Sequence, residues 1–197
     1  MAPGDFVVVD QFIDRTFARV KSFFGAGLVA HVSMAHPVCG RIGNHLMQAL
    51  AKISGIRAVQ GGTYLVMEGP QFSSLAESEL YRSWGCDVVG MTNMPEAKLA
   101  REAEICYATV AMVTDYDCWH EDHENVSVET VIQFVGENAL HARSLVSALA
   151  AGFQVRREEC SRGCDRALDN AVMTAPEARD AELIAKLEVV AGRVLLP

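Results

Sequence analysis

The sequence lacks the features that direct a chain to membranes or to nucleic acid. No stretch approaches the roughly 20 uncharged apolar residues of a transmembrane helix, and the opening Met1-Ala2-Pro3-Gly4-Asp5 lacks the basic and apolar regions of a secretory signal. Basic patches are missing as well, and the formal net charge of −8 disfavours nucleic acid and anionic lipid as partners. We therefore expect a cytoplasmic protein that binds a small molecule, with neither nucleic acid nor membrane as a partner.

Internal repeats, low-complexity runs and linkers are absent too, so we expect a single domain over residues 1–197. Half of the residues are hydrophobic and 21% are charged, which excludes a disordered chain. A chain of this length buries on the order of 70% of the surface that it exposes when unfolded. The glycine pair Gly61-Gly62 is not part of a G-x-G-x-x-G sequence, so no nucleotide cofactor is implied.

Strand and helix patterns alternate along much of the chain, and this alternation predicts an α/β domain. Strands are expected over residues 5–12, 56–60, 63–67, 86–91 and 105–113. Helices are expected from about residue 42 to a stop at Gly55, and over 74–84, 95–103, 127–151, 164–173 and 176–192. The two strands joined by Gly61-Gly62 are interpreted as a hairpin or a close pair. The whole pattern predicts a mixed β-sheet with helices on both of its faces.

Two carboxylates and two aromatic rings follow the strand expected over 105–113, in the segment Thr114-Asp115-Tyr116-Asp117-Cys118-Trp119. In an open α/β sheet the carboxyl ends of the strands face the ligand crevice, so acids there are candidates for contact with a substrate. Taken alone, an Asp-x-Asp pair after a strand is more often a turn or a helix cap. The residues themselves leave both interpretations open.

Two further strand ends carry polar residues and support a ligand-binding edge. The strand over 63–67 breaks at Gly69-Pro70 and continues as Gln71-Phe72-Ser73-Ser74, where Ser74 and Glu77 have the spacing of a helix capping box. The strand over 86–91 ends in Gly90-Met91-Thr92, and the following Asn93-Met94-Pro95-Glu96 is typical of a helix start.

Together, the segments 67–77, 90–96 and 114–119 closely resemble the methylthioadenosine phosphorylases of the purine nucleoside phosphorylase superfamily. So do residues 3–16, the segment His31-Val32-Ser33-Met34-Ala35-His36-Pro37 and the closing Val194-Leu195-Leu196-Pro197. The resemblance implies a purine nucleoside phosphorylase-like fold and phosphorolysis of S-methyl-5′-thioadenosine to adenine and 5-methylthioribose 1-phosphate, a reaction of purine and methionine salvage. It implies no cofactor, inorganic phosphate as a co-substrate, and a homotrimer or a dimer of trimers.

The resemblance also assigns residues to the purine. Asp115 is implied as the catalytic acid toward N7 and the 6-amino group, and Asp117 and Tyr116 are implied as further contacts of the base. A carboxylate accepts a hydrogen bond from an amino group, so Asp115 favours a 6-aminopurine, and Ser73 is implied as a second determinant of this specificity.

Other implied residues contact the sugar, the phosphate and the 5′-methylthio group. Met91 is implied beneath the ribose, and Thr92 is implied as a phosphate ligand ahead of the helix that starts at Pro95. Phe72 is implied near the base, and His31 is implied to reach the site from a neighbouring subunit. The pocket for the methylthio group is implied to be apolar and to consist of Val128, Val131, Ile132 and Leu195, with Val128 also a determinant of specificity.

The resemblance does not cover the beginning of the family's chain. Family members begin with a strand and a glycine-rich phosphate loop, followed by an Arg-His pair, so we expect an N-terminally incomplete member. The alternative is a non-catalytic fragment of the same fold that binds purine nucleosides or serves assembly.

Two groups of residues invite a metal interpretation, but we expect no metal site. The segment His120-Glu121-Asp122-His123, with Asp115 and Asp117, would suit a metal-dependent hydrolase, yet its ligand spacing lacks a third anchor. Cys160 and Cys164 lie four residues apart, and a metal site or a disulfide there is the alternative to free thiols.

Overall fold

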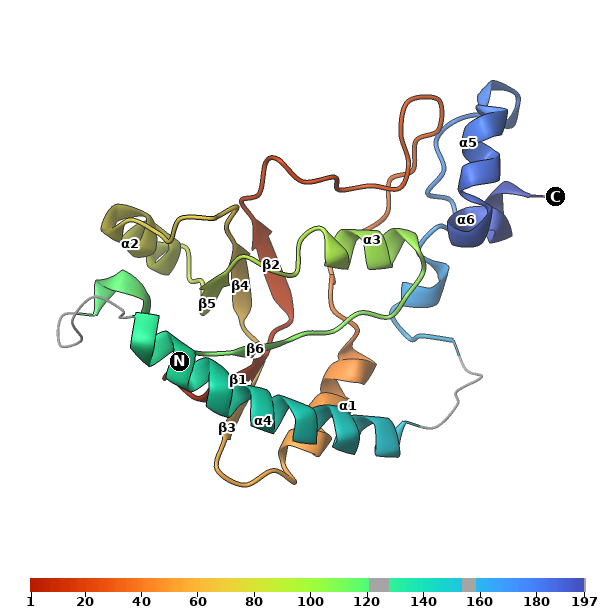
Figure 1. Cartoon of the computed structure of the whole chain (residues 1–197). Coiled ribbons are helices and arrows are strands. Elements are labelled where there is room, and N and C mark those ends of the chain that lie inside the picture. Colours follow the sequence, from red (N-terminus) through yellow and green to blue (C-terminus); the bar gives the residue numbers. More distant parts are fainter. Residues whose placement is uncertain (121–127, 154–158, 197) are drawn as a thin grey trace.

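The computed structural model describes residues 1–120, 128–153 and 159–196, and of residues 128–131 it describes the backbone alone. Within these ranges the strands form two three-stranded sheets with helices around them (Figure 1). In the first sheet, β1 (Asp5–Val8) pairs in parallel with β3 (Arg57–Gln60) and antiparallel with β6 (Val110–Met112). This sheet therefore has the mixed pairing that the sequence predicts.

The second sheet is parallel throughout. Its central strand β4 (Thr63–Val66) pairs with β2 (Gln11–Asp14) on one side and with β5 (Val88–Gly90) on the other. The strand expected over 5–12 is thus divided between the two sheets, and Val9 and Asp10 separate its halves.

The hairpin interpretation of Gly61-Gly62 is wrong, because β3 and β4 belong to different sheets. The two glycines carry the chain from one sheet to the other beside the junction of β1 and β2. The Gly61 N–H donates to the Val8 carbonyl (2.9 Å), and the Gly62 carbonyl accepts from the Asp10 N–H (3.2 Å). Their φ angles of +83° and +136° are open to glycine at no steric cost.

Residues 6–9 are apolar without interruption because both faces of this segment are buried. One face packs on α1 (Gly40–Leu50) and α4 (Val128–Gly152), and the other packs on the second sheet and on α3 (Glu96–Glu102). The first core consists of Phe6, Val8, Leu46, Ala49, Leu50 and Leu145. The second consists of Val7, Val9, Tyr64, Val66, Met94 and Ala97.

The capping box at the start of α2 (Leu75–Ser83) is confirmed. The Ser74 N–H donates to Glu77 Oε2 (2.8 Å), and the Glu77 N–H donates to Ser74 Oγ (3.4 Å). This pair of bonds fixes the direction in which the chain leaves the 67–73 loop.

The strand expected over 105–113 is shorter than predicted, since its register with β1 covers Val110–Met112 and only Val113 adds further backbone hydrogen bonds, to Gly4 and Asp5. The residues before it lie at the beginning of α1 instead, where the Tyr107 carbonyl accepts from the Cys39 N–H (2.7 Å).

The C-terminal region departs most from the prediction. The helix expected over 164–173 is wrong, since its only helical part is the short 3₁₀ turn η2 (Cys164–Arg166). The helix expected over 176–192 is divided into η3 (Pro176–Ala178), α5 (Ala181–Lys186) and α6 (Glu188–Leu195). A new helix, α5, begins after Asp180, because the Asp180 carboxylate accepts a hydrogen bond from the Leu183 N–H (2.7 Å) and so caps it. These turns close a separate small core, which consists of Leu28, Leu168, Ala171, Leu187, Ala191 and Leu195.

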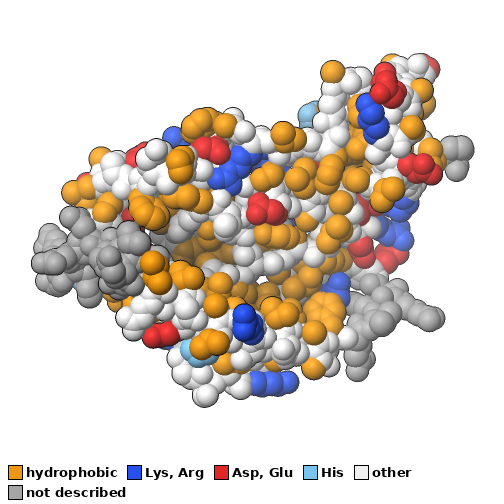
Figure 2. Space-filling model, viewed as in Figure 1, with side chains coloured by type: hydrophobic (Ala, Val, Ile, Leu, Met, Phe, Trp, Pro, Cys, Tyr) orange, Lys and Arg blue, Asp and Glu red, His pale blue; other side chains and the backbone are white. Residues whose placement is uncertain are grey.

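The surface of the molecule is hollowed between its α2–α3 side and its α4 side. Figure 2 shows hydrophobic side chains in this hollow, between the part that carries α2 and α3 and the part formed by α4.

Although α4 has 25 residues, neither it nor any other helix in the described ranges is long and apolar enough to cross a membrane.

Candidate functional site

A cavity of about 320 Å³ lies beside β5 and β6 and extends to the residues that follow both strands. Four of the predicted site residues line it, namely Thr92, Asp115, Tyr116 and Asp117. The opposite wall comes from α2, whose Ser78, Tyr81 and Arg82 also line the cavity. The fold therefore brings two of the three predicted strand ends to one site.

Asp115 is held firmly in the wall of this cavity. Its Oδ1 accepts from the Asp117 N–H (2.8 Å), and its Oδ2 accepts from the Thr114 hydroxyl (2.6 Å). Asp117 has a φ of +59° and begins the 3₁₀ turn η1 (Asp117–Trp119). The turn interpretation of Asp-x-Asp is thus correct, and the same turn places both carboxylates at the cavity.

Aromatic rings and one arginine close the cavity next to these acids. The Arg82 guanidinium lies 3.7 Å from the centroid of the Trp119 ring, and Tyr116 meets the same ring edge to face at 6.2 Å. Stacking of a guanidinium on an indole is favourable and holds both side chains in place. Arg82 could not be predicted as a site residue, because a basic residue in the last turn of a helix is common on any surface.

Thr92 is held by a tyrosine that the sequence analysis missed. The hydroxyl groups of Tyr64 and Thr92 lie 3.1 Å apart and share a hydrogen bond. Tyr64 is 6% exposed and passes directly over Gly90, where a Cβ atom would lie 2.0 Å from the tyrosine oxygen. The glycine in the Gly90-Met91-Thr92 motif is therefore needed for space.

Asn93, next to Thr92, is buried and has a φ of +74°. Its Oδ1 accepts a hydrogen bond from the Tyr107 hydroxyl (2.7 Å). Burial raises the pKa of Tyr107 to about 12, so this hydroxyl stays protonated and remains a donor. The bond fixes the backbone turn that presents Thr92 to the cavity.

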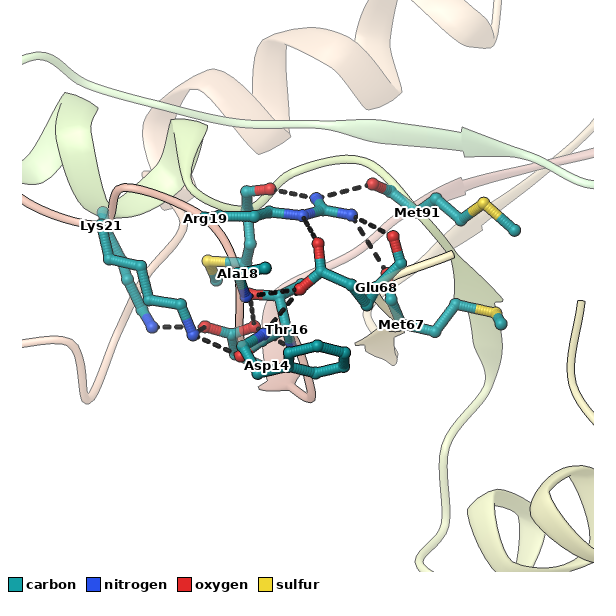
Figure 3. Close-up of polar contacts among 11 residues, drawn as sticks. Asp14, Thr16, Ala18, Arg19, Lys21, Met67, Glu68 and Met91 are labelled. Carbon is teal, nitrogen blue, oxygen red and sulfur yellow. Dashed lines mark hydrogen bonds and ion pairs between the residues drawn. The ribbon is translucent and has the colours of Figure 1, made fainter. Parts of the chain in front are cut away.

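A half-buried arginine, Arg19, joins the ends of β4 and β5. Figure 3 shows the Arg19 guanidinium between backbone oxygens of residues that follow these two strands. Its Nη1 donates a hydrogen bond to the Met91 carbonyl (2.8 Å), and its Nη2 donates to the Glu68 carbonyl (2.9 Å). The Glu68 carboxylate accepts from Arg19 Nε (3.0 Å) and from the N–H groups of Phe17 and Ala18. The Ala18 and Phe17 amides, followed by Arg19, lower the pKa of Glu68 to about 2.

Met91 and Ser73 lie near the cavity without lining it. The side chains of Met67 and Met91 extend to the same side, away from Arg19 (Figure 3). The Ser73 hydroxyl donates to Met67 Sδ (3.6 Å), and the Ser73 carbonyl accepts from the Cys118 thiol (3.5 Å). Ser73 thus connects the loop after β4 to η1. The three segments predicted to form the site, 67–77, 90–96 and 114–119, are therefore neighbours in the fold.

Four other predicted contacts do not belong to the described lining of the cavity. Phe72 is 77% exposed, Ile132 is 65% exposed, and His31 is exposed at the surface. Leu195 is buried in the C-terminal core, because α6 turns that side chain toward Leu28. The side chains of Val128 and Val131 lie outside the described residues. The roles of these residues stay predictions.

The two groups considered as metal ligands have different surroundings. His120 stacks at 4.7 Å on Tyr116, and Glu121, Asp122 and His123 lie outside the described residues. Cys160 and Cys164, in contrast, meet two more thiols away from the cavity. The Sγ atoms of Cys39, Cys106, Cys160 and Cys164 all lie within 4.8 Å of one another.

Comparison with known proteins gives one consistent family. Residues 1–151 match the model of the phosphorylase superfamily. The chain is 66% identical over 195 residues to S-methyl-5′-thioadenosine phosphorylase of Cereibacter sphaeroides, a match that covers 99% of this chain and 67% of that protein. It is 62% identical to the enzyme of the same name from Rhodospirillum rubrum, with 99% of this chain and 66% of that protein covered.

Solved structures agree with these relatives. A methylthioadenosine phosphorylase from an Antarctic soil metagenomic library superposes with a TM-score of 0.87 at 44% identity, covering 100% of this chain and 67% of that one. Methylthioadenosine phosphorylase from Schistosoma mansoni in complex with adenine gives a TM-score of 0.72 at 34% identity, covering 77% and 59%. The chain spans about two thirds of the length of the bacterial relatives that it matches.

Proposed function

The chain belongs to the S-methyl-5′-thioadenosine phosphorylases of the phosphorylase superfamily, and we propose that it acts in the reaction for which they are named. In this reaction phosphate attacks C1′ of S-methyl-5′-thioadenosine, adenine leaves, and 5-methylthioribose 1-phosphate is formed. We place this activity in the cytoplasm and assign it to an oligomer in which subunits share sites.

The observation that carries the proposal is the fixed carboxylate of Asp115 in the cavity wall. Hydrogen bonds from Thr114 and Asp117 orient it before any ligand arrives. A carboxylate in that position accepts from the 6-amino group of adenine, and in its protonated form it donates to N7 as the base departs. The stacked Trp119 and the ring of Tyr116 supply an apolar border of the kind a purine requires.

The charges of the cavity suit the base and the sugar better than the phosphate. Among the described residues that line it, the charged side chains are Asp87, Asp115, Asp117 and Arg82. Positive charge develops on the ribose as the bond to adenine breaks, and nearby carboxylates stabilise it. A phosphate dianion needs donors beyond the hydroxyl of Thr92, and Arg82 is engaged with Trp119.

Phosphate-dependent release of adenine from S-methyl-5′-thioadenosine tests the proposal. We expect Asp115→Ala to lower the rate by about 10² or more, the usual contribution of a general acid. Asp169→Asn is a matched control, because that carboxylate pairs with Arg193 outside the cavity. An Asp115→Ala variant as fast as the control would refute the assignment of Asp115.

Asp115→Asn tests the preference for a 6-amino group separately. An amide donates where a carboxylate accepts, so the variant is expected to lose adenine-type substrates and to gain 6-oxopurine nucleosides. The ratio of kcat/KM values for the two substrate classes measures this change. An unchanged ratio would mean that Asp115 does not read position 6.

The acidic cavity also favours a second candidate, a purine-nucleoside-binding fragment without turnover. Calorimetry on the 197-residue chain distinguishes the two. Binding of S-methyl-5′-thioadenosine that is unaffected by phosphate, with no adenine released, supports the fragment. Adenine release that depends on phosphate concentration supports the enzyme.

A further inference from the structure

Four thiols from three separate parts of the chain meet at the beginning of α1. Cys39 is the N-cap residue of that helix, Cys106 lies between α3 and β6, and Cys160 and Cys164 flank the turn before η2. Three of them are almost fully buried, with exposed fractions of 0% for Cys39, 6% for Cys160 and 1% for Cys164. All six cysteines of the chain are free.

The spacing of the sulfur atoms fits a tetrahedral metal ion. Zn²⁺ bound by thiolates has Zn–S distances of about 2.3 Å, which in a tetrahedron separates the sulfur atoms by about 3.8 Å. The Sγ atoms of Cys39 and Cys160 are 3.8 Å apart, and all four lie within 4.8 Å of one another. Cys160 and Cys164 are separated by three residues, within the usual spacing of paired zinc ligands.

Positive charge lies beside the cluster, where burial alone would keep the thiols protonated. Arg41 Nη2 lies 3.5 Å from Cys106 Sγ, and the charge of the buried Arg101 acts on Cys164. Four neutral thiols packed as small hydrophobic groups do not need two guanidinium groups beside them, whereas a tetrathiolate zinc centre carries a charge of −2 that they compensate.

We propose that Cys39, Cys106, Cys160 and Cys164 bind one structural Zn²⁺ ion. The ion replaces the four thiol protons and leaves no open coordination position, so it has no part in the chemistry of the cavity. It connects the segment around residues 159–165 to the beginning of α1 and to the chain that leads into β6. The proposal departs from the expectation of no metal site, which considered Cys160 and Cys164 without Cys39 and Cys106, the two partners that only the fold supplies.

Metal content of the purified chain is the direct test. The chain is produced with zinc in the medium, kept reduced and purified without chelators, and its metals are measured by inductively coupled plasma mass spectrometry. We expect about one zinc ion per chain. Replacement of zinc by Co²⁺ is expected to give the thiolate-to-cobalt charge-transfer band and the strong visible absorption of a tetrahedral site.

Variants assign the ion to the four thiols. Cys39→Ser and Cys164→Ser are expected to lower the zinc content at least about tenfold, because each removes one of four ligands. Cys86→Ser is the matched control, since Cys86 lies outside the cluster. In the native protein a thiol reagent is expected to modify only Cys86 and Cys118. After denaturation in the presence of a chelator, the reagent is expected to modify all six cysteines.

The measurement on the unmodified chain does not depend on whether any variant folds. A reduced, folded chain without zinc that gives no cobalt–thiolate spectrum would overturn the proposal. Full zinc content in Cys39→Ser, or a disulfide among these cysteines in place of the ion, would overturn it as well.

Discussion

Gly90 shows how a single residue sets the geometry of the site. The absence of a Cβ atom lets the Tyr64 ring pass over the end of β5 and reach Thr92. Tyr64 is itself fixed by burial and by an edge-to-face contact with Phe12 at 6.1 Å. The position of the Thr92 hydroxyl therefore depends on a residue that has no side chain.

We expect Gly90→Ala to lower the free energy of unfolding by about 1–3 kcal/mol, because the new methyl group overlaps the Tyr64 hydroxyl and forces the ring aside. The measurement is urea unfolding followed by circular dichroism. In a Tyr64→Phe background, which lacks the overlapping oxygen, the same substitution is expected to cost less.

Gly136→Ala is the matched control for this prediction. A Cβ atom at Gly136 meets nothing within 4 Å, and alanine favours the α4 helix over glycine. The control is expected to be as stable as the unmodified chain or more so. Equal stability of Gly90→Ala and Gly136→Ala would contradict the packing argument.

At the scale of elements, the network around Arg19 and Glu68 holds a long loop to the strand ends of the site. The loop between β2 and α1 has no helix or strand of its own, and Arg19 attaches it to the carbonyls that follow β4 and β5. Asp14 at the end of β2 adds ion pairs with Lys98 and Lys21. Burial raises the pKa of Asp14, but the hydrogen bonds from Lys98, Thr16 and Lys21 outweigh it and lower the pKa overall.

This network is expected to weaken in acid. The pKa of Glu68 is about 2 in the folded chain and 4.5 ordinarily, so the ionised carboxylate stabilises the fold above about pH 4.5. That contribution is lost as the pH falls from 4.5 toward 2. We therefore expect Glu68→Gln to have a lower urea midpoint than the unmodified chain at pH 7, with the difference shrinking steadily below pH 4.5.

Glu79→Gln is the control, because it removes an exposed carboxylate from α2 without touching the loop. It is expected to leave the urea midpoint unchanged at pH 7. A difference between Glu68→Gln and the unmodified chain that is as large at pH 3 as at pH 7 would show that Glu68 does not act through its charge.

At the scale of the whole molecule, large apolar side chains remain at the surface. On α4, Val135 is 51% exposed and Val146 is 65% exposed, and on the loop after β2 Phe17 is 82% exposed. Large exposed apolar side chains are typical of surfaces that contact other protein when they lie together. The exposure of these side chains agrees with the proposal of an oligomer. It also agrees with the greater length of the relatives, in which additional residues can cover such side chains.

The isolated 197-residue chain is therefore expected to self-associate. Val135→Glu combined with Val146→Glu places two charges on the exposed apolar side of α4 and is expected to weaken association at least about tenfold. Sedimentation velocity over a range of concentrations measures the effect. Ser144→Glu with Ser147→Glu adds the same charge at exposed polar positions of the same helix and is expected to have little effect.

A chain that sediments as a monomer at every concentration would contradict this expectation. So would equal weakening by the two double variants, because the effect would then come from net charge and not from the apolar side of α4.

The predictable part of the fold follows from local patterns. The capping box at Ser74, the apolar face that packs α1 on Phe6 and Val8, and the strands that end at Gly90 and before Asp115 are each encoded within about a dozen residues. The acids of the site could be predicted for the same reason, since they stand directly after a strand.

The sequence by itself determined the approximate positions of most strands and helices before residue 153, and it determined which strand ends carry acids and hydroxyl groups, because these features depend on neighbouring residues. Only the tertiary structure decided that Tyr64 holds Thr92, that Arg82 stacks on Trp119 and that four distant thiols converge. These contacts join residues far apart in the chain, and their geometry exists only after the sheets and helices have packed together. The division of residues 5–14 between two sheets also depends on distant residues, since β1 pairs with β3 and β2 pairs with β4.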